Sequence, residues 1–163
     1  MTAMEESITL KKLKERFPDS IIDTHSFRGD DTAIVKKEDI LQITKFLRDD
    51  GELLYNFMMD LTAVDYLGRE PRFEVVYHLY SLKYNKRVRI KVPVPEQDCT
   101  IDSIISIWIA ADWFEREAYD LYGIIFKGHP NLKRILLYEG FKGHPLRKDY
   151  PVRKRQPLIG PKN

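Results

Sequence analysis

Residues 57–92 constrain the fold most, because they contain three strand-length apolar runs separated by two short turns. The first two runs, 57–66 and 73–82, are joined by a segment that contains glycine and proline. The third run, 87–92, alternates strictly between an apolar residue and arginine or lysine, as a strand with one buried face does. These residues predict an antiparallel meander. Its basic face is either a solvated sheet surface or a partner contact.

Two helices and two short strands are expected before the meander. Residues 7–17 and 39–50 repeat apolar side chains at helical spacing, and proline or glycine follows each segment. Residues 21–27 and 32–35 have strand-like composition and are separated by a plausible hairpin turn. The N-terminal third therefore predicts helices that can pack on a sheet.

Residues 101–122 return to helical spacing. Asp112 followed by Glu115 has the form of a capping box, so we expect two helices that meet near Asp112. Beyond them, glycine and proline recur and regular periodicity is lost. The chain thus divides into an α+β domain, residues 1–122, and an irregular C-terminal arm, residues 123–163. The domain should have a mixed or antiparallel sheet with helices packed on it, and the extended, proline-rich, basic arm should pack on partner subunits.

A single cysteine, Cys99, and a net charge of +2 limit the chemistry of the chain. One thiol cannot form an intrachain disulfide, and an iron–sulfur cluster or a thiolate zinc site needs more than one. The longest apolar stretch is interrupted by four polar residues, whereas a membrane span needs about 20 largely apolar residues. We therefore expect no metal site in the chain, and membrane association only through partners.

Motifs for nucleotide binding or hydrolysis are missing from the sequence. It has no Gly-x-Gly-x-x-Gly, no Walker-type loop and no Gly-x-Ser-x-Gly. The C-terminal tail is basic but lacks the interleaved aromatic residues of a nucleic-acid stacking surface. Nucleic acid is therefore not an expected partner, although an RNA-binding accessory protein remains a third reading.

The densest polar cluster comprises Glu115, Arg116, Glu117 and Asp120. Carboxylates three residues apart can serve acid–base or metal chemistry, but helical metal sites usually add a histidine on the next turn. Here the next residues are Leu, Tyr, Gly and Ile. We interpret the cluster as a charge network that anchors helices or contacts a partner, in which Arg116 and Asp120 are spaced to pair.

His129 and His144 lie in two copies of the pentapeptide Phe-Lys-Gly-His-Pro. No cysteine lies nearby and no acid stands at ligand spacing, so the pattern favours turns with polar contacts. A small hydrolase or metal enzyme that uses Glu117, Asp120 and His129 remains an alternative of a different class.

Residues 113–124, Trp-Phe-Glu-Arg-Glu-Ala-Tyr-Asp-Leu-Tyr-Gly-Ile, resemble the signature of the 30-kDa subunit, designated C, of bacterial NADH:quinone oxidoreductase, which is respiratory complex I. Residues 126–136 and 143–151 fit the same family, and 61–66 and 72–79 resemble its central hairpin. The resemblance covers most of the chain after the first fifty residues.

This resemblance implies a non-catalytic, cofactor-free subunit of the peripheral arm, which supports electron transfer from NADH to quinone coupled to proton translocation. NADH, FMN, iron–sulfur clusters and quinone would then belong to partner subunits. The chief neighbours would be the quinone-site subunit and the terminal iron–sulfur subunit, on the cytoplasmic side of the cell inner membrane. The equivalent subunit of a related membrane-bound hydrogenase or of a photosynthetic complex-I-like enzyme is the alternative.

No catalytic, cofactor-binding or metal-ligating residue is expected. The residues expected to anchor helices or to contact partners are Glu115, Arg116, Glu117, Asp120, His129, Arg134, His144, Arg147, Lys148 and Asp149.

Overall fold

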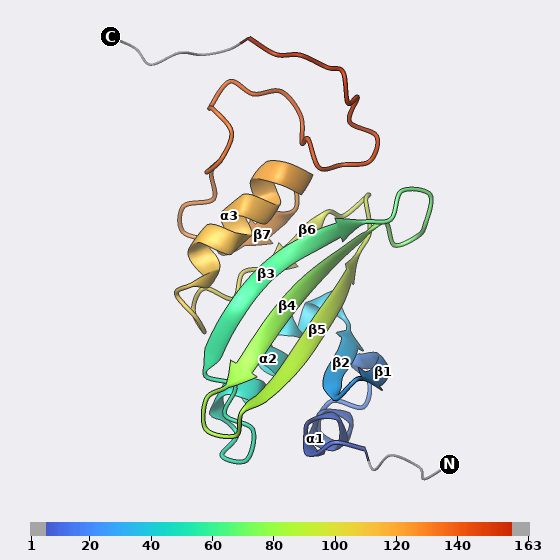
Figure 1. Ribbon diagram of the computed structural model, residues 1–163, viewed down its shortest axis with the longest axis vertical. Helices are drawn as coiled ribbons and strands as arrows, with labels where there is room; N and C mark the ends of the chain where they lie inside the picture. The colour runs from blue at the N-terminus through green and yellow to red at the C-terminus, as the bar shows by residue number, and fades with distance from the viewer. Residues whose placement is uncertain (1–5, 158–163) are drawn as a thin grey trace.

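A computed structural model describes residues 6–157, which contain three α-helices, one short 3-10 helix and seven strands (Figure 1). In chain order the elements are α1 (Ile8–Arg16), β1 (Ile21–Phe27), β2 (Asp30–Val35), η1 (Lys37–Asp39), α2 (Ile40–Asp49), β3 (Phe57–Asp65), β4 (Phe73–Ser81), β5 (Lys86–Val94), β6 (Thr100–Asp102), α3 (Ala111–Tyr122) and β7 (Ile125–Lys127). In this part of the chain no helix has the length and apolar character needed to cross a bilayer.

Five strands form one mixed sheet in the order β1-β2-β5-β4-β3. The three strands of the predicted meander are antiparallel neighbours, and the parallel pairing of β2 with β5 joins them to the β1–β2 hairpin. Helices α1 and α2 cover one side of this sheet, and α3 lies along β3 (Figure 1). The predicted α+β class with a mixed sheet is therefore confirmed.

Strand β5 shows why the alternating pattern was informative. Its two inner valines and its isoleucine are at most 1% exposed, and they face the core. On the opposite face, Arg89 Nε donates to His78 Nε2 at 2.8 Å, and Lys91 pairs with Glu74 at 2.9 Å. Cross-strand polar pairs of this kind stabilise an open sheet face, so the basic residues of β5 are partly engaged within the sheet.

Only one helix, α3, forms where two were predicted between residues 101 and 122. The expected first helix is replaced by β6, which pairs in parallel with β7, and by the turns that follow it. Glu115 does not close a capping box, because its carboxylate accepts hydrogen bonds from Ser103 Oγ at 2.5 Å and Ile104 N at 2.7 Å. The apolar spacing in this segment reflects burial of turn residues instead of a helix.

Regular structure also continues past the predicted domain boundary at residue 122. Ile124 is 0% exposed and Phe126 is 2% exposed, so β7 belongs to the core of the domain. From residue 128 to residue 157 the chain has turns and bends but no helix or strand, and we call this segment the arm. Residues 158–163 of the predicted arm lie outside the described residues.

Replacing Phe126 by alanine should lower the free energy of unfolding by about 3–5 kcal/mol, because it leaves a cavity in the core. Chemical denaturation of the purified chain measures this change. The neighbouring Ile125 is 47% exposed, so Ile125→Ala should change stability by no more than about 0.5 kcal/mol. Equal losses in the two variants would contradict the assignment of β7 to the core.

Candidate functional site

The arm meets the domain at the C-terminal end of α3. A helix leaves its last four carbonyl oxygens without helical partners, and here residues 119–122 carry them. The donors to these four carbonyls, in order, are Gly123 N, His144 Nδ1, Leu146 N and Arg147 Nε, at 2.8, 2.9, 3.1 and 2.6 Å, and Arg134 Nη1 also donates to the Asp120 carbonyl at 3.2 Å. Four of the five donors come from the arm. Arg147 also brings positive charge to the negative end of the helix dipole.

The close approach of His144 requires glycine at position 123. Gly123 has a φ of +77°, and a Cβ there would lie 2.6 Å from His144 Nε2. Since a carbonyl only accepts, the proton of His144 is on Nδ1, which donates to the Asp120 carbonyl. Burial and the guanidinium groups of Arg147 and Arg134 lower the pKa of His144. The Nδ1–H group of His144 therefore caps the helix.

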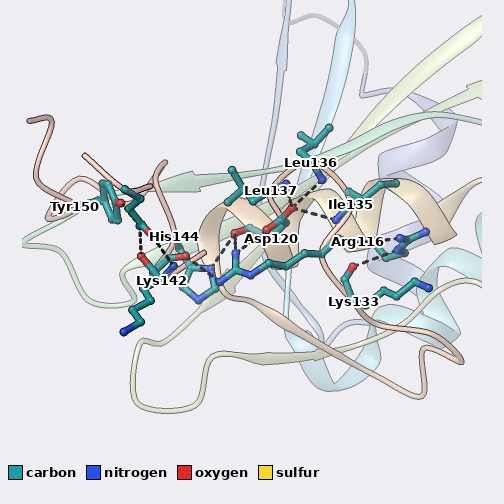
Figure 2. A network of polar contacts seen from close by, with 12 residues as sticks. Arg116, Asp120, Lys133, Ile135, Leu136, Leu137, Lys142, His144 and Tyr150 are labelled. Carbon is teal, nitrogen blue, oxygen red and sulfur yellow. Dashed lines mark hydrogen bonds and ion pairs between the residues drawn. The ribbon is translucent and has the colours of Figure 1, made fainter. Parts of the chain in front are cut away.

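Asp120 holds the arm through its fully buried carboxylate (Figure 2). Its Oδ1 accepts from Arg134 Nη1 at 2.6 Å, and its Oδ2 accepts from the main-chain N–H groups of residues 135–137 at 3.0, 2.9 and 2.9 Å. Burial alone would raise the pKa of Asp120, but these donors outweigh it and hold the pKa below its usual value. The charged carboxylate thus organises the first part of the arm.

Arg116 binds carbonyls of the same stretch of the arm, and Arg134 links this stretch to residue 143. Arg116 does not pair with Asp120 at helical spacing; it donates to the carbonyls of Lys133 and Arg134, both at 3.2 Å (Figure 2). Arg134 in turn donates to the Gly143 carbonyl at 3.1 Å. Residues of α3 therefore fix both the N–H groups and the carbonyls of the arm segment that they face.

A second cluster, centred on Arg72, holds the arm further along. Arg72 is 3% exposed and binds Asp65 through two hydrogen bonds of 2.9 Å each. The same guanidinium binds Asp149 at 2.9 and 3.2 Å and Glu96 at 2.6 Å. Asp65 also accepts the main-chain N–H of Lys148 at 2.7 Å. Hydrogen bonds from Arg72 hold the pKa values of Asp65 and Asp149 below their usual range.

Arg147 lies between the two clusters. Besides its bond to the helix end, its guanidinium lies 5.0 Å from the centre of the Phe73 ring, as does that of Arg72. Lys148, predicted as an anchoring residue, contributes its backbone N–H to Asp65. We call the Asp120 and Arg72 clusters together the arm clasp.

Glu115 anchors the loop before α3 instead of the arm. Its side chain is fully buried, and burial raises the pKa of Glu115 to about 7, against the opposing effect of the hydrogen bonds from Ser103 and Ile104. The nearby carboxylate of Asp112 adds to the increase. Glu115 is therefore a titratable group inside the domain.

The geometry does not support the metal-enzyme alternative. His129 Nε2 is 3.2 Å from the Asp112 carbonyl, and its Nδ1 accepts from Asn131 N at 3.0 Å, so both ring nitrogens are engaged. Both carboxylate oxygens of Asp120 are engaged as well, and Glu117 is exposed. Within residues 6–157, no group of three or more His, Cys, Asp or Glu side chains could hold a metal ion.

Sequence reasoning missed Asp65, Arg72 and Glu96. Asp65 and Arg72 flank the turn of the β3–β4 hairpin with opposite charges, and antiparallel pairing brings the two strand ends together. This pair of opposite charges on either side of a predicted turn could have been recognised in the sequence. The contacts of Arg72 with Glu96 and Asp149 span 24 and 77 positions of the chain, and no local pattern marks them.

Replacing Asp120 by asparagine should loosen the arm, because Arg134 then loses its buried anion. We expect the free energy of unfolding to fall by about 3 kcal/mol, and trypsin to cut faster after Lys133 and Arg134. Urea unfolding and limited proteolysis measure the two effects. Glu117→Gln, an exposed change on the same helix, should alter neither. If Asp120→Asn behaves like this control, Asp120 does not hold the arm.

Glu115 should make stability depend on pH. Its pKa is raised from 4.5 to about 7 in the folded chain, so its contribution is fully present below pH 4.5 and is lost as the pH rises through about 7. Glu115→Gln removes this loss. Relative to wild type, the variant should therefore gain up to about 3 kcal/mol between pH 5 and pH 8. Unfolding curves across this range test it, and parallel pH profiles would count against a raised pKa.

Known proteins share both the sequence and the fold. The family described as "Respiratory-chain NADH dehydrogenase, 30 Kd subunit" matches residues 33–156. An NADH-quinone oxidoreductase subunit of Citrifermentans bemidjiense is 54% identical over 158 residues, which are 96% of this chain and 97% of the relative. A solved chain described as Nqo5 of the trypsin-resistant fragment (1-134) aligns with a TM-score of 0.66 and 30% identity, over 77% of this chain and 100% of that chain.

A chain of the membrane-bound sulfane sulfur reductase, an archaeal respiratory membrane complex, aligns with a TM-score of 0.75 over 88% of this chain and 84% of its own. At 21% identity this likeness concerns the fold alone. The resemblance expected from the sequence is confirmed by the family match and by the identity to the bacterial relative. The chain belongs to the family of 30-kDa subunits of respiratory-chain NADH dehydrogenase.

Proposed function

We propose that this chain is a structural, non-catalytic subunit of the peripheral arm of an NADH:quinone oxidoreductase. In this role it holds neighbouring subunits in register while electron transfer from NADH to quinone, coupled to proton translocation, takes place in them. Its family supports the assembly. The observation that carries the mechanical role is an arm clasped to the domain at its base, beyond which residues 151–155 are exposed.

The part of the arm after Tyr150, which we call the distal arm, has the properties of a segment that docks on other chains. Val152 is fully exposed, and the cations Arg153, Lys154 and Arg155 are exposed and form no ion pair with a described acid. A cationic segment without secondary structure does not bury itself, and it becomes ordered at an interface. The solved relative is named as a trypsin-resistant fragment. That name supports a protease-resistant domain followed by a more accessible arm.

We extend the proposal to the neighbouring subunits, the location and the cofactors. We propose the quinone-site subunit and the terminal iron–sulfur subunit as neighbours, with no nucleic acid and with membrane contact only through partners. The location would be the cytoplasmic side of the cell inner membrane. A cofactor-free role is favoured because the carboxylates of Glu115 and Asp120 are used in structural hydrogen bonds. The hydrogenase-like alternative is less supported, since the close sequence relatives are named as NADH-quinone oxidoreductase subunits.

Truncating the chain after Tyr150 tests this proposal. The clasp contacts of residues 147–149 remain, so the isolated domain should keep a melting temperature close to wild type. Assembly of the complex should fall, because the distal arm is gone. Native electrophoresis of membranes from cells that produce the truncated chain measures assembly, together with NADH:quinone activity.

A full-length variant in which Arg153, Lys154 and Arg155 are replaced by glutamine serves as the control for charge. It keeps the length of the arm, so an assembly defect shared with the truncated chain assigns the effect to these cations. Normal assembly of the truncated chain would show that the distal arm is dispensable and would overturn the proposal.

A further inference from the structure

An apolar groove lies between α3 and the proximal part of the arm. It has a volume of about 860 Å³. On the side of α3 it is lined by Ile109 and Trp113, which are 86% and 69% exposed, and on the side of the arm by Ile135 and Leu136, of which Leu136 is 63% exposed. Side chains of this size are costly to leave in water. The groove therefore has the character of a surface that another molecule covers.

We infer that this groove receives an α-helix of a partner subunit, a helix with an apolar face and a lysine or arginine on or beside that face. The inference deepens the proposed function, because it assumes that the chain works within an assembly. It concerns a surface separate from the distal arm.

Charge around the groove selects a basic occupant. Its lining includes Asp112, Arg116 and Glu117. Arg116 donates to two main-chain carbonyls of the arm, whereas Glu117 is exposed and has no cation paired with it among the described residues. The net charge of the lining is negative. A cation on the incoming helix would complement it, while a second copy of this chain would bring another Glu117 to the same rim.

Backbone geometry selects a helix over a strand. Strand addition needs free main-chain N–H and C=O groups. Here the N–H groups of Ile135 and Leu136 are bound to Asp120, and the backbone of α3 is bonded within the helix. With these N–H groups occupied, a strand cannot pair with the arm wall, and side chains form the contact surface; Trp113 and Glu117 stand one turn apart on α3. Such a surface suits ridge-into-groove packing of a second helix.

The groove is also built before any partner arrives. Asp120 holds the backbone of the arm wall, and Arg116 holds the carbonyls just before that wall. Because the wall is fixed in advance, little ordering cost remains for binding. A small ligand is a poorer fit, since ligand pockets enclose most of the ligand surface and the side chains that line this groove are largely open to solvent.

Photo-cross-linking in the assembled complex tests the inference. Trp113 is replaced by p-benzoylphenylalanine, and Phe27, which is 67% exposed on β1, is replaced in the same way as the control. Irradiation at position 113 should give an adduct with a helical segment of another subunit that has a lysine or arginine within one turn. An adduct with a second copy of this chain, with lipid only, or with a segment that lacks a basic residue overturns the inference, as does no adduct at all.

Competitive incorporation gives a second readout. When each variant is co-produced with a differently tagged wild-type chain, Trp113→Ala should be under-represented in the purified complex by about 30-fold, as expected for a binding hot spot. Phe27→Ala should compete equally. Glu117→Lys should also be under-represented, and reversal of the cross-linked cation on the partner should restore it. Equal incorporation of Trp113→Ala would contradict the inference, while complete exclusion of the wild-type chain from the complex would instead contradict the proposed function.

Discussion

The path of the arm depends on the last carbonyl oxygens of α3, which require hydrogen-bond donors. A helix that ends against other protein must find donors for its last four carbonyls. In this chain the donors come mainly from residues 144–147, so the end of the helix and the course of the arm are one structural unit. The Asp120 carboxylate extends this unit by binding three successive N–H groups at residues 135–137. A segment with no secondary structure of its own thereby acquires a defined path.

Two buried charged side chains make the clasp specific for one arrangement of the arm. Arg72 and Asp120 are almost completely buried, and each is matched by several partners of opposite charge or polarity. Charges in such places destabilise the fold when a partner is missing, so the clasp favours one arrangement of the arm over others. Beyond Tyr150 the described residues contain no buried charge: Gln156 bonds to the main chain of Lys142 and to the Tyr150 hydroxyl, and the cations before it are exposed. The change from anchored to exposed chain separates the part of the arm that serves the domain from the part available to neighbours.

Local patterns were sufficient for the meander, for the first two helices and for the signature on α3. They failed between β5 and α3, where apolar residues at helical spacing fold as a short strand and turns. The reason is that β7, a distant segment, supplies the main-chain partners that β6 needs. Glu115 in turn binds the loop between β6 and α3. The same limit applied to the candidate site: the polar residues of α3 were recognised, but the Arg72 cluster was not, because its members are joined across up to 83 positions of the chain.

Local residue patterns and composition were enough to predict which strands alternate between core and solvent, where the main turns lie, and that one thiol cannot build a cluster. These are properties of neighbouring residues and of composition, and burial of an apolar face makes them unambiguous. The folded chain was needed to show which donors satisfy the helix end, which arginine meets which carboxylate, and that the arm forms one wall of an apolar groove. Those outcomes depend on hydrogen-bond satisfaction between distant segments, a constraint that operates only once the chain has folded.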